Sequence, residues 1–174
     1  MPLKNILTLL AGGDRRSIGR SDEVAAMVSE DPGLFPRLIK GLWSDDPLVR
    51  MRAADATEKF TRAHRELLQS YKKELLGLMA ETEQQELRWH LAAMVPRLRL
   101  SARERQLAVS LMNAYLDDRS SIVKTSALQG LADLAQHDAS LRPKVLELLR
   151  ASTRNGTAAM KARSRKLLLQ LEGR

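Results

Sequence analysis

Apolar residues recur along the chain with the spacing of a helix. In the segment VRMRAADATEKF, residues 49–60, apolar or small side chains stand at offsets of zero, four, seven, eight and eleven. On an α-helix these offsets fall on one side, where they form a stripe that packs against a core. Strand-type alternation appears nowhere over a useful length. The pattern predicts an amphipathic helix here and an all-α protein.

The same pattern occurs four times. The segments begin at Val49, Leu87, Val123 and Met160, and the steps between them are 38, 36 and 37 residues. Such a near-constant step fits a repeated hairpin of two helices. The predicted stripes are Val49, Ala53, Ala56, Thr57 and Phe60; Leu87, Leu91, Met94, Val95 and Leu98; Val123, Ala127, Gly130, Leu131 and Leu134; and Met160, Ser164, Leu167, Leu168 and Leu171.

Each of these second helices follows a first helix. The first helices are expected at residues 34–43, 71–80, 102–116 and 141–151, and the connecting turns carry capping residues such as Asp46 before Pro47. Residues 3–11 and 15–29 are expected to form an atypical N-terminal cap hairpin within residues 1–30. We therefore expect one domain over residues 1–174, an α-α superhelix (solenoid) of about four to five hairpins, with four regular ones over residues 34–171.

The stretch DDPLVRMRAADATEKF, residues 45–60, resembles the turn and second helix of a HEAT repeat. In that family an Asp lies in the turn and an Arg follows the first apolar residue of the second helix. Arg50, Arg88, Lys124 and Lys161 occupy the Arg position, and Asp45 or Asp46 and Asp117 or Asp118 supply turn acids. ELRWHLAAMVPRL, residues 86–98, is similar to small stand-alone bacterial HEAT-domain proteins of unassigned function. The resemblance implies an armadillo-like fold.

The basic column at the Arg position has two interpretations. It can bind phosphates, or each cation can reach turn acids and the carbonyls that close the preceding helix. The second interpretation predicts a structural column.

Composition excludes several functional classes. The chain has no Cys, its three His are scattered, and it contains no glycine-rich phosphate-binding motif. We therefore expect no enzyme activity, no metal, no cofactor and no small-molecule substrate. The short apolar run at residues 6–11 is too short to be a signal peptide or a membrane span, so we expect a soluble cytoplasmic protein without a membrane partner.

Second helices line the concave side of HEAT solenoids, so the resemblance implies a partner groove along their polar columns. The candidate partner-binding residues are Arg52, Asp55, Lys59, Trp89, His90, Arg97, Gln129, Asp133, Arg163 and Lys166. Trp89 can anchor a partner, since Trp is enriched at binding hot spots, or pack against a neighbouring repeat. The columns are mixed in charge, and a solvated polar face would look the same.

The net charge of +8 favours acidic partners. In the last hairpin Arg154, Lys161, Arg163, Arg165 and Lys166 have no acid among them, which suits phosphate binding or a soluble terminal cap. The first functional hypothesis is a scaffold that binds a protein partner along the second helices. The alternative is a nucleic-acid-binding HEAT protein, remotely similar to DNA alkylation-repair glycosylases, although no catalytic Asp can be matched.

Overall fold

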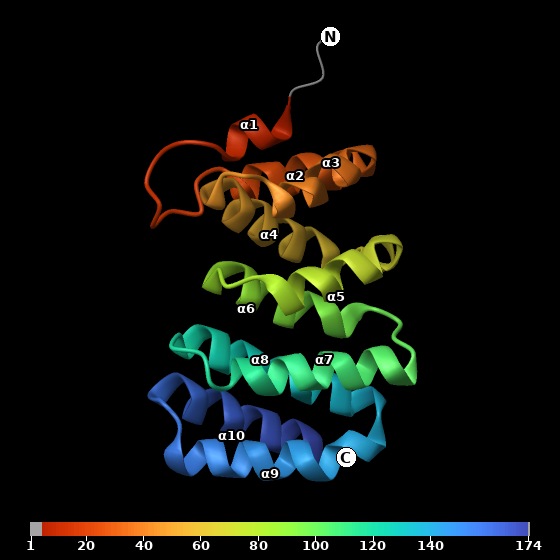
Figure 1. Cartoon of the computed structure of the whole chain (residues 1–174), viewed down its shortest axis with the longest axis vertical. Helices are drawn as coiled ribbons and strands as arrows, with labels where there is room; N and C mark the ends of the chain where they lie inside the picture. The colour runs from red at the N-terminus through yellow and green to blue at the C-terminus, as the bar shows by residue number, and fades with distance from the viewer. Residues whose placement is uncertain (1–4, 174) are drawn as a thin grey trace. The chain divides into compact units, whose positions relative to one another are not determined.

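The computed structural model describes residues 5–173, and its regular structure there is entirely helical (Figure 1). Helices account for 80% of the described residues, which contain no strand. This confirms the expected all-α class. The chain divides into two compact units, Met1–Ser70 and Tyr71–Arg174, which are described in turn.

The first unit contains four α-helices among its described residues. They are α1 (Ile6–Leu10), α2 (Ser21–Glu30), α3 (Phe35–Lys40) and α4 (Pro47–Thr61), with the 3₁₀ segments η1 (Pro32–Leu34), η2 (Gly41–Trp43) and η3 (Arg65–Tyr71). Helix α4 contacts α1, α2 and α3. Phe60 of α4 packs on Phe35 with ring centroids 5.3 Å apart, so the longest helix forms the centre of this unit.

The N-terminal hairpin differs from its prediction. The helix expected over residues 15–29 begins only at Ser21, because the side chains of Asp14 and Ser17 accept hydrogen bonds from the backbone of Arg16 and Gly19 and form turns instead. Gly19 has a φ of 56°, a left-handed conformation that interrupts a helix. Of the helix expected over residues 3–11, the structure shows Ile6–Leu10, and residues 3 and 4 lie outside the described residues.

The second unit contains three helical hairpins. Their helices are α5 (Lys72–Glu81) with α6 (Gln85–Met94), α7 (Ala102–Tyr115) with α8 (Ser121–His137), and α9 (Arg142–Asn155) with α10 (Ala158–Glu172). The 3₁₀ segments η4 (Val95–Arg97) and η5 (Ala139–Leu141) precede α7 and α9. Each of these six helices begins within two residues of its predicted start. Side-chain caps explain much of this agreement: Ser101, Ser120 and Thr157 accept backbone hydrogen bonds at the starts of α7, α8 and α10.

Successive second helices of this unit lie side by side. Helix α8 contacts both α6 and α10, as Figure 1 also shows. The predicted stripe positions of these helices and of α4 are buried, apart from Met160 and Leu168, which are partly exposed. The apolar periodicity of the sequence therefore identified the inward face of each second helix.

Gly130 lets the backbone of α8 approach its neighbours closely. A Cβ atom at this position would lie 2.7 Å from the carbonyl oxygen of Ala92 in α6 and 2.8 Å from the sulfur of Met112 in α7. Neither distance is compatible with a side chain. The glycine is needed here for packing, since its φ is not in the left-handed region.

Candidate partner-binding surface

The basic column at the start of the second helices has a structural role at two of its four positions. In the first unit, Nη1 of Arg50 donates to the carbonyl oxygen of Ser44 at 2.7 Å. In the second unit, Nε of Arg88 donates to the carbonyl oxygen of Thr82 at 2.9 Å. Both guanidinium groups thus satisfy backbone acceptors in the turn before their own helix. This geometry agrees with the structural interpretation of the column rather than with a ladder for phosphates.

Arg88 also joins two neighbouring turns of the second unit. Its Nη1 donates to Oδ2 of Asp118 at 2.6 Å, and the guanidinium lies 5.3 Å from the ring centre of Tyr115. The Tyr115 hydroxyl donates to the carbonyl oxygen of Met79 at 2.5 Å, and burial raises the pKa of this phenol. Asp118, Arg88 and Tyr115 therefore tie the α7–α8 turn to the α5–α6 hairpin.

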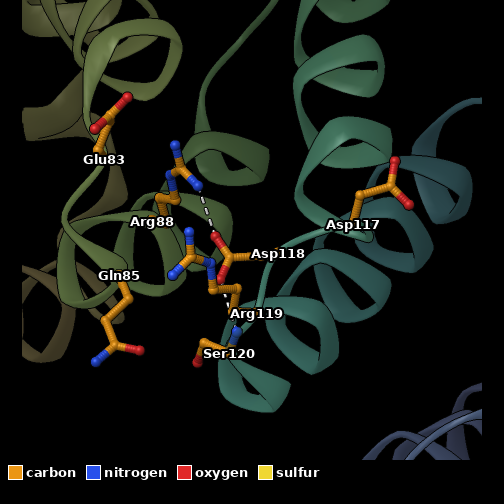
Figure 2. Close-up of a pocket in the computed structure, with 7 residues that line it drawn as sticks. All are labelled: Glu83, Gln85, Arg88, Asp117, Asp118, Arg119 and Ser120. Atoms are coloured by element: carbon orange, nitrogen blue, oxygen red, sulfur yellow. Dashed lines mark hydrogen bonds and ion pairs between the residues drawn. The ribbon is translucent and has the colours of Figure 1, made fainter.

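A pocket of about 460 Å³ opens beside this ion pair (Figure 2). It is lined by Glu83, Gln85, Arg88, Asp117, Asp118, Arg119 and Ser120. Both oxygens of Asp118 are engaged, since Oδ1 accepts from the backbone N–H of Ser120 at 2.8 Å. The lining mixes cations and carboxylates and does not select one class of ligand. The candidate residues predicted from sequence did not include Gln85 or Arg119. The constant repeat step could have pointed to them, because it brings the turns of successive hairpins together.

Asp118 makes the stability of the second unit sensitive to acid. Burial opposes its ionisation, but the hydrogen bonds from the Ser120 N–H and from Arg88, with the charges of Arg88 and Lys124, outweigh burial and lower its pKa. A carboxyl whose pKa is lower in the folded state contributes stability above its unfolded pKa of about 3.9, and this contribution disappears as the pH falls through the folded pKa.

We expect Asp118→Asn to lower the free energy of unfolding by about 1–3 kcal/mol at neutral pH, because a charge-assisted hydrogen bond is lost and Arg88 loses its charged partner. The difference between wild type and variant should shrink as the pH falls from neutral to below the unfolded pKa of about 3.9. Denaturant unfolding at both pH values measures it. A difference that does not change with pH would contradict the role of the Asp118 charge.

In the first unit, the N-terminal segment covers Arg52. Its side chain is buried, with 3% of the residue exposed, and the guanidinium donates to the carbonyl oxygens of Leu10, Gly12, Asp14 and Ser17 at 2.5–3.2 Å. Because the backbone of residues 10–17 wraps around this cation, Arg52 holds the segment in place. We therefore do not include it in a partner surface.

Asp55 and Lys59 of α4 are engaged by α2. Asp55 accepts a hydrogen bond from the Ser21 hydroxyl at 2.5 Å, and Nζ of Lys59 contacts carboxylate oxygens of Asp22 and Asp55 at 2.5 and 2.7 Å. Partial burial opposes the charge of Lys59, yet these hydrogen bonds raise its pKa above the usual value. The predicted polar column of α4 thus connects two helices of its own unit.

In the second unit, predicted residues of α8 and α10 are hydrogen-bonded to one another, and Arg97 of η4 lies close enough for its charge to act on them. Nη1 of Arg163 in α10 donates to Oε1 of Gln129 in α8 at 2.7 Å, and Nε2 of Gln129 donates to Oδ1 of Asp133 at 2.8 Å. Burial raises the pKa of Asp133, although the Gln129 hydrogen bond and the charges of Arg97, His137 and Arg163 act in the opposite direction. The structure therefore brings together Arg97, Gln129, Asp133 and Arg163, as the sequence columns implied.

The rings of Trp89 and His90, which are consecutive in α6, contact each other. Their ring centres are 5.6 Å apart, Trp89 is half-buried, and 8% of His90 is exposed. Nδ1 of His90 lies 2.7 Å from the carbonyl oxygen of Glu86, one turn earlier in α6. His90 therefore has a largely internal environment, whereas Trp89 keeps part of its ring accessible.

Lys166 of α10 is exposed, and among residues 5–173 it has no ion-pair or hydrogen-bond partner. We name the exposed side of α6, α8 and α10 the second-helix surface. It is defined by Trp89, Arg97, Gln129, Asp133, Arg163 and Lys166.

Residues 5–173 contain no candidate metal site and no helix that could span a membrane. No group of three or more His, Cys, Asp or Glu side chains is placed to hold a metal ion there. No helix in this part of the chain has both the length and the apolar character needed to cross a bilayer. Comparisons with protein-family models, with curated proteins and with solved structures find no match to this chain.

Proposed function

We propose that the chain is a non-catalytic interaction protein built from HEAT-like hairpins, and that a protein partner docks on the second-helix surface. One observation carries the proposal. Helix α8 lies beside both α6 and α10, and the contact from Arg163 of α10 to Gln129 of α8 links polar side chains across helices, while Gln129 in turn donates to Asp133 of its own helix. These contacts hold donors, acceptors and charges in fixed positions on one face, as a specific protein interface requires.

The turns support the HEAT-like description of the hairpins. In that repeat a basic residue near the start of the second helix contacts the turns, and here Arg50 and Arg88 bind turn carbonyls while Arg88 also binds Asp118 of the next turn. The recurrence of one contact at one register position is the behaviour of a structural repeat.

The mixed charge of the surface favours a protein partner over a uniform polyanion. Asp133 lies close enough to Arg97 and Arg163 for their charges to act on it, so this part of the surface presents a carboxylate as well as cations. Recognition would depend on matched polar groups around the accessible part of Trp89, which offers a large rigid anchor.

The test is an affinity capture from a lysate of the source organism, with and without nuclease. We expect the wild-type chain to retain a nuclease-resistant protein that Arg97→Ala/Arg163→Ala no longer retains, because the double substitution removes two cations from the second-helix surface. Mass spectrometry of the retained fraction identifies the partner.

The matched control is Arg37→Ala/Lys40→Ala, which removes two exposed cations from α3. It should capture the partner as the wild type does, and melting curves should show both variants folded. Equal capture by the two variants would contradict docking on the second-helix surface, and so would the absence of any nuclease-resistant partner.

A further inference from the structure

The positive charge of the protein is concentrated in its last hairpin. Residues 142–174 contain nine Lys and Arg against two Glu, whereas residues 1–141 contain 20 basic and 19 acidic residues. Nearly all of the net charge of +8 therefore belongs to the segment that forms α9 and α10. The rest of the chain is close to neutral.

The two glutamates of this hairpin pair with cations of α9 and leave the other described cations without a carboxylate partner. Glu172 pairs with Arg150 at 2.5 Å, and Glu147 pairs with Lys144 at 3.3 Å. Within residues 5–173, no carboxylate lies within ion-pair distance of the remaining cations, which are Arg142 at the start of α9 and, in or beside α10, Arg154, Lys161, Arg163, Arg165 and Lys166. Three cations elsewhere in this unit do have carboxylate partners: Lys72 pairs with Glu104, Arg88 with Asp118 and Arg105 with Asp138.

The cations in or beside α10 surround the exposed side of this helix. Ser164, Leu167 and Leu171 form its buried side. At about 100° per residue, Arg165 and Lys166 fall on the opposite side, flanking Leu169, which is 75% exposed. Lys161 in the first turn of α10 and Arg154 in the last turn of α9 lie next to the turn that joins the two helices. We name Arg154, Lys161, Arg165 and Lys166 the basic hairpin surface.

We propose that the basic hairpin surface binds the phosphate backbone of double-stranded nucleic acid without reading its sequence. Long, unpaired cations on one side of a hairpin are complementary to the regular negative charge of a duplex, and each phosphate contact releases bound counterions. The four side chains are cations, and phosphate oxygens, which they would contact along the backbone of a duplex, carry no sequence information.

The composition of the hairpin favours a duplex over other polyanions. Residues 142–174 contain no aromatic residue, and single-strand binding depends on stacking of bases on aromatic rings. An anionic bilayer would require a broad apolar face beside the cations, and Leu169 is the only large apolar side chain of α9 and α10 that is prominently exposed in the described residues. The binding surface therefore matches a duplex best.

The experiment is fluorescence anisotropy of the full chain with labelled duplex DNA of two unrelated sequences, at several salt concentrations. We expect equal affinity for both sequences and a log–log salt slope near about −4, as four phosphate contacts predict. Arg165→Gln/Lys166→Gln should reduce the size of this slope by about 2 and weaken binding about a hundredfold at ~50 mM salt.

Arg37→Gln/Lys40→Gln is the matched control, since it removes the same charge from an exposed helix outside the hairpin. It should bind DNA almost as tightly as the wild type. Circular dichroism checks that the variants fold, and Arg154→Gln/Lys161→Gln provides an independent pair on the same surface. A wild-type chain that does not bind duplex at low salt, or two hairpin variants that bind like the control, would overturn the proposal.

Competing polyanions complete the test. Tighter binding to single strands, to vesicles containing phosphatidylserine or to poly-glutamate than to duplex would also overturn it. The result is independent of the protein partner proposed above. Arg154→Gln/Lys161→Gln separates the two proposals, because neither residue belongs to the second-helix surface. Loss of DNA binding in this variant with continued nuclease-resistant capture supports both proposals, whereas loss of the nuclease-resistant partner alone affects only the second-helix surface.

Discussion

Leu91→Asp is expected to destabilise the unit Tyr71–Arg174 by at least about 4 kcal/mol. Leu91 belongs to α6, which packs against α8, and its side chain is fully buried. The substitution removes apolar packing and places a carboxylate where the structure offers no partner, two effects that are each costly. Thermal unfolding followed by circular dichroism should show a large drop in melting temperature or no folded signal for this unit.

Leu169→Asp is the matched control for this experiment. The substitution is chemically the same, but Leu169 is 75% exposed on α10, so its carboxylate remains in water. We expect a change within about 0.5 kcal/mol. If Leu91→Asp melted at the same temperature as Leu169→Asp, the inward face of α6 would be assigned incorrectly.

Arg52→Met is expected to release the N-terminal segment of the first unit and to lower its stability by about 3 kcal/mol. The guanidinium is the donor for four backbone carbonyls between Leu10 and Ser17, and methionine fills space but donates nothing. The segment carries Arg15, Arg16 and Arg20, so limited trypsin digestion should cut there much faster in the variant.

Arg37→Met is the control, because Arg37 is exposed on α3 and removing it leaves the segment undisturbed. Arg52→Lys should be intermediate, since an ammonium group retains the charge but lacks the planar arrangement of donors. Digestion of the segment at the wild-type rate in Arg52→Met would show that Arg52 does not hold it.

The helices of the chain were predictable from local sequence. The spacing of apolar residues such as Leu87, Leu91 and Met94 identifies the buried face of a helix from sequence alone. Capping residues such as Ser120 and Thr157 mark where a helix begins. The proximity of Arg163 and Gln129, which are 34 residues apart, could also be inferred from sequence. Because the repeat step is 36–38 residues, equivalent turns of successive second helices become neighbours.

The environment of Arg52 was not predictable in the same way. Arg52 aligns with polar residues of the other second helices, which suggested that it lies on the exposed side of α4. The residues that bury it come instead from a non-repetitive segment up to 42 positions earlier. No periodicity connects Leu10 and Gly12 with Arg52. The same limit applies to Asp55 and Lys59, whose partners Ser21 and Asp22 stand at the start of a helix that sequence placed six residues too early.

The close approach at Gly130 has a consequence for the thermodynamics of partner binding. Where interdigitated side chains separate two helices, a change of rotamer can shift one helix relative to the other. Here backbone meets backbone, because the Cα of Gly130 faces the carbonyl of Ala92, and the spacing between α8 and α6 has no such freedom. A partner that docks across these helices would meet a frame already in its bound geometry, so the entropy lost on association would come mainly from the long side chains.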